Sequence, residues 1–341
     1  MSGEWIELAA PPLAATFVTA LVLSWLATGA VLRQLRRRAI LDRPNERSSH
    51  AIPTPRGGGI GMLAALLPAW CGIVLLGYGD ASSLAVAAAV LILAVVSWRD
   101  DVGGLSPAIR LVVQALAVIA GLVFLPGAGT VFQDLLPAWL DRAASALLWL
   151  WFVNAFNFMD GIDGIAGTEA AAIGAGIALL ALFHLDAIGL GTGMLGAAAA
   201  GAALGFLGWN WQPAKVFMGD VGSVPLGYLL GWLLLNLAAA GYWAPALILP
   251  LYFLADASWT LLRRLARGDK IWQPHREHFY QHAVQAGRSH QAVVLRVLFA
   301  DLVLIGASLW AAAGPEAPAL AVAIVTVAIL LVELSRPAKP S

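Results

Sequence analysis

Four short segments place charged, amide and imidazole side chains in an otherwise apolar chain. They are residues 98–104 (WRDDVGG), 154–167 (NAFNFMDGIDGIAG), 215–223 (KVFMGDVGS) and 274–282 (PHREHFYQH). A carboxylate at membrane depth costs about 2.5–3.5 kcal/mol, so such residues usually mark a functional site. The second segment holds two aspartates and two asparagines, which is more than a single turn needs. Together, the four segments predict a site that does chemistry.

The chemistry that these side chains fit best is metal-assisted phosphoryl transfer. Mg²⁺ in proteins usually takes one or two carboxylates and completes its shell with water and substrate phosphates. Arginine and histidine beside carboxylates are suited to gripping phosphate. One Mg²⁺ does not need all five aspartates, so some of them would bind a polar ligand or move protons: Asp100, Asp101, Asp160, Asp163 and Asp220. We expect transfer from a charged, soluble donor to an acceptor embedded in lipid.

Each segment also has a purely structural interpretation. Asp100 and Asp101 could form a turn at the membrane surface, with Asp101 capping the next helix. Residues 154–167 could form a turn with Asx hydrogen bonds, eased by glycine. The histidines of residues 274–282 could lie in a solvated loop, and a zinc site there would lack both a nearby cysteine and an H-E-x-x-H helix. Only the four segments taken together favour a catalytic site.

The elements that carry these segments are predicted to be membrane-spanning helices. The chain has 341 residues, of which 60% are apolar and 12% are charged, whereas soluble domains carry roughly a quarter charged residues. Apolar runs of about 20 residues indicate one polytopic all-α membrane domain, residues 1–341. About eleven spans are expected, near 6–32, 58–79, 82–98, 109–126, 143–157, 165–185, 190–209, 222–240, 243–262, 291–313 and 317–334. The formal net charge of zero implies no nucleic-acid partner, and the single Cys71 excludes an intrachain disulfide.

Basic residues predict the orientation of these helices. Alternation of the spans puts 18 of the 20 basic residues on one side of the membrane. The positive-inside rule assigns this side to the cytoplasm, which gives a periplasmic N-terminus and a cytoplasmic C-terminus. The four polar segments follow the third, fifth, seventh and ninth spans, so all four should emerge on the cytoplasmic face. Cytoplasmic loops are expected near 33–57, 99–108, 158–164, 210–221 and 263–290.

In this order, the segments resemble the polyprenyl-phosphate N-acetylhexosamine-1-phosphate transferases, most of all the branch that initiates O-antigen. The resemblance covers residues 42–282 and includes 42–59 (DRPNERSSHAIPTPRGGG) and 210–223 (NWQPAKVFMGDVGS). It implies an enzyme of the bacterial inner (cytoplasmic) membrane that uses Mg²⁺, with Mn²⁺ as a substitute. Such an enzyme joins a UDP-N-acetylhexosamine to undecaprenyl phosphate and releases UMP. The product, undecaprenyl-diphospho-sugar, starts O-antigen or a related cell-surface polysaccharide.

The resemblance also implies a role for each matching residue. Catalysis would fall to Asp100, Asp101 and Asp160, and Asp220 would ligate Mg²⁺. Nucleotide binding would involve Asn157, Asp163, Asn210, Phe217 and His50, with Phe217 stacked on uracil. Phosphate or sugar binding would involve His275, Arg276, His278, Lys215 and Arg56. Two positions depart from related patterns: His50 replaces a lysine of the peptidoglycan branch, and Gly104 replaces a third acidic residue.

A polytopic transporter with a cytoplasmic carboxylate-lined site is the alternative. Such a transporter would place carboxylates near mid-span on broken helices. The only acidic residue interpreted as lying within a span is Asp256, near a cytoplasmic end. A CDP-alcohol phosphotransferase would need an arginine shortly after Asp160 and Gly161, which this chain lacks. The sequence leaves the sugar open among several UDP-N-acetylhexosamines.

Overall fold

The computed structural model describes residues 3–42, 44, 52–79, 81–123, 125, 130–270, 273 and 275–337. Most of the described chain is helical. The longer helices are α1 (Gly3–Arg37), α2 (Gly59–Ile73), α3 (Ala81–Gly103), α4 (Pro107–Val123), α5 (Ala138–Phe158), α6 (Ile165–Phe183), α8 (Leu190–Asn210), α9 (Asp220–Ala239), α11 (Leu251–Ala266), α13 (His290–Ala313) and α14 (Glu316–Ser335). The shorter elements are α7 (Leu185–Ile188), α10 (Trp243–Ile248), α12 (Phe279–Gln285), the π-helical turn η1 (Val74–Tyr78), and the strands β1 (Leu41–Asp42) and β2 (Thr54–Pro55).

The apolar runs of the sequence form the long helices, as their length and composition predict. Eight helices in the described part of the chain are long and apolar enough to cross a membrane, which confirms an all-α polytopic membrane protein. They comprise Ile6–Arg37, Gly59–Tyr78, Ser82–Gly103, Ile165–Phe183, Leu190–Asn210, Asp220–Ala239, His290–Ala313 and Glu316–Ser335. The shorter helix Pro107–Val123 is also apolar. The number of eleven spans and their orientation stay predictions.

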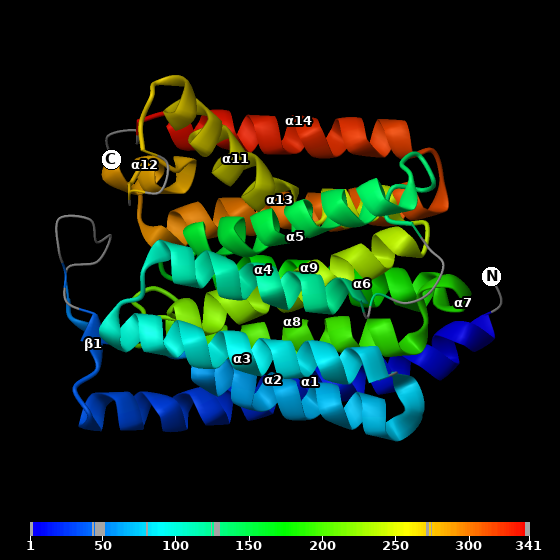
Figure 1. Ribbon diagram of the computed structural model, residues 1–341, viewed down its shortest axis with the longest axis horizontal. Coiled ribbons are helices and arrows are strands. Elements are labelled where there is room, and N and C mark those ends of the chain that lie inside the picture. The colour runs from blue at the N-terminus through cyan, green and yellow to red at the C-terminus, as the bar shows by residue number, and fades with distance from the viewer. Residues whose placement is uncertain are drawn as a thin grey trace.

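The long helices lie side by side along the longest dimension of the molecule (Figure 1). The strand β1, the short helix α12 and the last turn of α14 lie at one end of this bundle, and α7 lies at the opposite end (Figure 1). Most long helices alternate in direction, so the segments that follow α1, α3, α5, α8 and α11 gather at the same end as β1. This end is where the polar segments of the sequence meet.

Small residues let the central helices pack with their backbones close together. On α8, a side chain at Gly201 would lie 2.2 Å from the carbonyl oxygen of Phe17 of α1, and one at Gly205 would lie 2.3 Å from that of Leu21. Helix packing in membranes favours small residues for this reason, because lipid supplies no hydrophobic driving force between helices. The α1–α8 contact therefore fixes the first helix against the middle of the bundle.

One predicted span is wrong as a continuous helix. Residues 243–262 divide into α10 and α11, with a break at Leu249 and Pro250. Proline has no backbone N–H to donate within a helix, and its ring clashes with the preceding turn. As a result, α11 runs obliquely to the neighbouring long helices (Figure 1).

Two statements about carboxylates also change. The helix α3 continues to Gly103, so Asp100 and Asp101 lie in its last turn and the connection to α4 is shorter than the loop expected near 99–108. Asp256 is not the only acidic residue within a helical span, because Glu169 lies in α6 and Asp301 lies in α13. The sequence interpretation was wrong on this point.

A short hairpin ties the first loop to a segment far along the chain. The strands β1 and β2 pair antiparallel, with Leu41 opposite Pro55. The next residue, Arg56, forms a parallel bridge with Phe217, and the N–H groups of Gly57 and Gly58 donate to the Phe217 carbonyl. This pairing places Arg56 directly beside the N-terminus of α9.

Candidate active site

The N-terminus of α9 is capped by an aspartate from α3. One oxygen of the Asp101 carboxylate accepts from the backbone N–H of Asp220 at 3.1 Å, and the other accepts from that of Val221 at 2.9 Å. These N–H groups have no partner inside the helix, and the helix dipole favours a negative charge there. Sequence analysis allowed Asp101 to cap the next helix, but it caps α9, which begins 119 residues later.

Two arginines link this cap to the other aspartates of the site. Arg56 Nη2 lies 2.8 Å from Asp101 Oδ1 and 2.9 Å from Asp220 Oδ1. Arg110 Nη1 lies 2.9 Å from Asp100 Oδ2 and 3.5 Å from Asp220 Oδ2. We call Arg56, Asp100, Asp101, Arg110 and Asp220 the arginine junction. It joins the β2 end, α3, α4 and α9, and it leaves three carboxylates against two guanidinium groups.

Asp160 lies in the turn between α5 and α6 and faces the arginine junction. Burial and then the negative charge of Asp220 raise the pKa of Asp160 to about 7. No described residue donates a hydrogen bond to the Asp160 carboxylate. Asn157, one helical turn earlier on α5, likewise has no side-chain partner among the described residues. Both side chains are therefore available to a ligand.

A tyrosine from α12 closes over this turn. The Tyr280 hydroxyl donates to the Phe158 carbonyl at 2.9 Å. A side chain at Gly161 would lie 2.1 Å from that hydroxyl, which real structures do not tolerate. Gly161 is needed here because the aromatic side chain packs directly on the backbone next to Asp160.

The second aspartate of the turn holds loops together. Asp163 Oδ2 accepts from the Ala214 N–H at 3.0 Å, and Asp163 Oδ1 lies 3.3 Å from His290 Nδ1 at the start of α13. Asn210 accepts from the Gly164 N–H and donates to the Val216 carbonyl. We call Asp163, Asn210, Ala214 and His290 the histidine junction. Its polar atoms are largely satisfied within the protein.

The two remaining motif residues before α9 lie at the edge of the site. The Lys215 ammonium lies 5.4 Å from the centre of the Trp209 ring, which is a cation–π contact. Phe217 is half-buried, and its backbone bonds the segment that follows β2. Its role as a stacking platform for a base stays a prediction.

The histidine segment packs against α11 and the end of α5. His278 Nδ1 lies 3.1 Å from Asp256 Oδ1, and the His278 ring stacks on Tyr280 and lies 4.9 Å from the His275 ring. Burial, followed by the charges of His278 and Arg264, lowers the pKa of His275 to about 4. His275 is therefore neutral near pH 7 and offers a nitrogen lone pair or an N–H to a ligand.

A basic cluster flanks this segment. Arg264 Nη1 lies 2.5 Å from Glu277 Oε1, and Arg267 also pairs with Glu277. Arg263 donates to the Glu277 carbonyl at 3.0 Å. The Arg276 carbonyl accepts from Gln285. Glu277 thus holds two arginines of α11, and Arg267 just after it, next to the predicted phosphate-binding residues.

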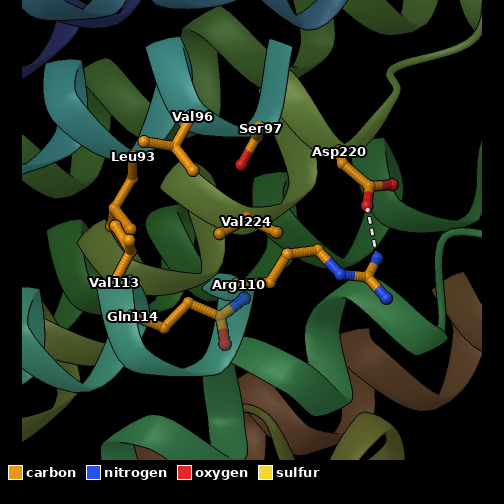
Figure 2. A pocket seen from close by; sticks show the side chains of 8 residues that line it. All are labelled: Leu93, Val96, Ser97, Arg110, Val113, Gln114, Asp220 and Val224. Carbon is orange, nitrogen blue, oxygen red and sulfur yellow. Dashed lines mark hydrogen bonds and ion pairs between the residues drawn. The ribbon is translucent and has the colours of Figure 1, made fainter. Parts of the chain in front are cut away.

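A hollow opens beside the arginine junction, between α3, α4 and α9. It is small, and its lining consists of Leu93, Val96, Ser97, Arg110, Val113, Gln114, Asp220 and Val224. In Figure 2 the Arg110 side chain points towards Asp220. The apolar side chains of Leu93 and Val113 lie on the opposite side of the hollow. The outer face of α4 is apolar and exposed, as at Ile109, Val112 and Leu116. The hollow therefore has both a charged end and an apolar wall.

A divalent cation fits this site only together with an anionic ligand. In the described part of the chain, no group of three or more His, Cys, Asp or Glu side chains could hold a metal ion. Mg²⁺ needs only one or two protein carboxylates when phosphates and water supply the other oxygens. Asp220, with Asp160 nearby, matches that requirement. Arg56 and Arg110 already bind both oxygens of Asp220, so a metal–diphosphate would take over these contacts.

The structure brings most of the predicted site residues to one end of the bundle, but it divides their tasks. Asp101, Asp163 and Asn210 bond the protein itself, whereas Asp160 and Asn157 are open. His50 lies outside the described residues, so its predicted role is not placed. Sequence reasoning missed three residues that contact the site: Arg110, Asp256 and His290. For Arg110 there was a signal, since a basic residue in the first turn of a helix opposes the helix dipole.

Several known proteins are similar to this chain over most of its length. The model of glycosyl transferase family 4 matches residues 83–238. A decaprenyl-phosphate N-acetylglucosaminephosphotransferase of Mycobacterium tuberculosis is 30% identical, over 87% of this chain and 82% of that protein. A probable undecaprenyl-phosphate N-acetylglucosaminyl 1-phosphate transferase of Bacillus subtilis is 26% identical, over 86% and 85%. A phospho-N-acetylmuramoyl-pentapeptide-transferase of Mycobacterium avium is 28% identical, over 81% and 90%.

Proposed function

Because this chain belongs to glycosyl transferase family 4, the polyprenyl-phosphate N-acetylhexosamine-1-phosphate transferases, we propose that it uses a UDP-N-acetylhexosamine as donor and undecaprenyl phosphate as acceptor. The products are undecaprenyl-diphospho-N-acetylhexosamine and UMP. We place the reaction on the cytoplasmic face of a bacterial inner membrane. The product would start an O-antigen or a related cell-surface polysaccharide.

One observation carries this proposal. Three acid-bearing turns, which are remote in sequence, meet at one end of the bundle, and Arg56 and Arg110 bridge the carboxylates of Asp100, Asp101 and Asp220. Such a site can bind a diphosphate, because the guanidinium groups can exchange a carboxylate for a phosphate. It can also bind a magnesium ion, because carboxylates become free when the arginines move.

The reaction balances without any other reactant. An oxygen of the prenyl phosphate attacks the β-phosphorus of the donor, the bond from that phosphorus to the bridging oxygen breaks, and UMP leaves with this oxygen. Arg110 and Asp100 lie next to the hollow that would receive the prenyl phosphate. Asp100 can orient this phosphate or accept its proton, and Arg110 offsets its charge.

The metal that the family implies fits at Asp220 and Asp160. When bound, Mg²⁺ would neutralise charge on the diphosphate as the phosphoryl group moves. The chain itself supplies positioning: Asp101 fixes the N-terminus of α9, so that Asp220 is held at the mouth of the site. Neutral His275 and the nearby arginines of α11 would face the sugar or the diphosphate.

The hollow beside α4 supports a lipid acceptor. The exposed apolar residues on the outer face of α4, next to this hollow, would contact membrane lipid and suit an isoprenoid chain. A prenyl phosphate keeps its tail in the bilayer and its phosphate at the headgroup level. The charged end of the hollow is therefore where the acceptor phosphate would lie.

The test is an assay of purified protein in detergent with undecaprenyl phosphate and a panel of radiolabelled UDP-N-acetylhexosamines. The expected result is lipid-extractable label and an equal amount of UMP for one donor. A chelator should stop turnover, and Mg²⁺ or Mn²⁺ should restore it. Full activity in excess chelator would contradict the metal requirement. Uptake of the sugar nucleotide into vesicles without lipid product would support the transporter instead.

A further inference from the structure

Two carboxyl side chains meet inside the bundle, away from the candidate active site. Glu169 of α6 is 0% exposed and Asp301 of α13 is 1% exposed. The two carboxyl groups lie close enough to interact with each other, and none of their four oxygens has a hydrogen-bond donor in the described chain. Both helices belong to the predicted membrane spans, and they pack against one another. The proposed reaction uses neither residue.

These carboxyl groups have no other polar partner in the described chain. None of their four oxygens accepts a hydrogen bond from an N–H or hydroxyl group of another described residue. No arginine, lysine or histidine of the described chain forms an ion pair with either one. Tyr252 of α11 lies close enough to interact electrostatically with both carboxyl groups, but it donates its hydroxyl to Asp256. A negative charge here would therefore be uncompensated.

Charge considerations fix the protonation state of the pair. Moving an isolated carboxylate into an apolar interior costs so much that the group takes up a proton instead. Two carboxylates in contact cannot both ionise. With no cation to stabilise even one charge, the state of lowest energy has both groups protonated. Each O–H can then donate to the carbonyl oxygen of the other group, which satisfies both donors.

The pair lies close in sequence to the contact between Asp163 and His290. Glu169 lies near the start of α6, six residues after Asp163 of the preceding turn, and Asp301 follows His290 by eleven residues, or about 16 Å along α13. His290 contacts Asp163, and Asp301 contacts Glu169, so α13 contacts residues 163–169 at two points. Two such points fix both the distance and the relative rotation of α6 and α13. The turn that carries Asp160 leads directly into α6.

We propose that Glu169 and Asp301 form a neutral carboxylic acid pair that holds α6 against α13 and thereby positions the turn from Asp160 to Asp163. They are positioning residues, because they act on the site through helix placement and touch no reacting atom. The role in positioning rests on the proposed function, whereas the protonation state does not.

Infrared difference spectroscopy tests the protonation state. The wild-type protein at neutral pH should show the carbonyl stretch of buried, protonated carboxylic acids, and the double variant E169Q/D301N should lose it. If wild type and the double variant give the same spectrum in this region, the pair is ionised and the proposal fails. This measurement needs no enzymatic activity.

Kinetics and thermal unfolding test the positioning role. D301A leaves the Glu169 acid without a partner and should raise the KM for the sugar nucleotide roughly tenfold, with a smaller change in kcat. The double variant E169Q/D301N keeps a neutral, reciprocally bonded pair and should restore KM and thermal stability. S308A is the matched control, because it removes another buried, unpartnered polar group from α13; it should leave KM unchanged.

The outcomes separate the two ideas. If D301A keeps the wild-type KM, or if the double amide variant is as impaired as D301A, the positioning role is wrong. If D301A does not fold, E169Q/D301N still decides: a double variant that folds with wild-type stability and KM supports the neutral pair, and a double variant that also fails to fold overturns it. If no UDP-sugar is turned over by the wild type, the proposed function fails, while the infrared result still stands.

Discussion

The arginine junction and the histidine junction contain the same acidic residue type and lie at the same end of the bundle, yet they are built differently. In the arginine junction, Asp100 and Asp220 pair with the side chains of Arg56 and Arg110, at distances of 2.9–3.5 Å. In the histidine junction, the Asp163 carboxylate accepts from the Ala214 N–H, and the Asp163 N–H donates to Nδ1 of the buried His290. Side-chain pairs at a partly open site can change partners when a ligand arrives. Bonds to the backbone cannot change without refolding the loop.

This difference separates residues that should matter for chemistry from residues that should matter for shape. Neighbouring residues can differ in this respect. Asp101 adjoins Asp100 in the sequence, but its carboxylate accepts hydrogen bonds from two backbone N–H groups at the start of α9. The side chain of Asp101 is 2% exposed, whereas that of Asp220 is 15% exposed. Variants of the two junctions should therefore fail in different ways.

The largest effect is expected at Asp220. D220N removes the charge that would hold a metal and should lower kcat/KM on the order of 10³-fold, because metal-borne charge stabilisation is worth several kcal/mol. UMP release measures this loss, and the thermal unfolding temperature in detergent should stay close to that of the wild type. D134N, an exposed aspartate outside the site, is the control and should be fully active. Near-normal turnover by D220N would remove the arginine junction from the chemistry.

The second effect concerns the shape of the other junction. H290A removes the partner of Asp163 and should lower the free energy of unfolding by about 1–3 kcal/mol, the cost of leaving a buried polar group unsatisfied. It should also raise the KM for the sugar nucleotide more than it lowers kcat. H184A removes a histidine that packs against Tyr242 elsewhere and serves as the control. Normal stability with a hundredfold loss of kcat would instead place His290 in the reaction.

A pH-dependent effect is expected at Asp160. Its pKa of about 7 in the folded protein exceeds the value of about 3.9 for an exposed aspartate. The folded state therefore binds the proton more tightly, and stability falls as the pH rises from about 4 to about 7. D160N has no such charge, so its unfolding temperature should exceed that of the wild type by a margin that grows between about pH 5 and pH 7 and then levels off. A constant margin over this range would contradict the raised pKa.

The smallest effect is expected at Lys215. An exposed cation–π contact contributes about 0.5–1 kcal/mol, so K215A should change stability by no more than this. If Lys215 only packs on Trp209, the KM for the sugar nucleotide should change by less than about threefold. A tenfold increase in KM would instead assign Lys215 to phosphate binding, as its motif predicted. The side chains that change partners when a ligand binds would then extend beyond the arginine junction.

The fold and the gathering of the acidic turns could be predicted from sequence. Long apolar runs form helices, and successive spans run in opposite directions, so the segments after every second span emerge at the same end of the bundle. The bends could be predicted less well: the break at Pro250 lay within an apolar run that reads as one span. Within the site, the motifs identified the acidic residues, but motifs do not show which atoms those residues bond.

The assignments that sequence reasoning missed depend on tertiary register. Asp101 caps α9 because the end of α3 lies beside the start of α9 when the two helices pack. No local sequence pattern specifies this relative position along the helix axes. His290 begins a helix that follows the last motif, so only the fold reveals its contact with Asp163. The pairing of Glu169 with Asp301 had a visible sign, since each interrupts an apolar run in the sequence, but their partnership required the packing of α6 on α13.

The ion pair between Arg56 and Asp220 also has a consequence for biosynthesis. The two residues are 164 positions apart. At roughly 5–20 residues per second, the ribosome adds the acid about 8–30 s after the base. During most of that interval Asp101 is already available to Arg56, whereas Asp220 is not. A nascent chain arrested before residue 220 would therefore be a membrane protein with an incomplete arginine junction, which forms only when the later half of the polypeptide has been inserted.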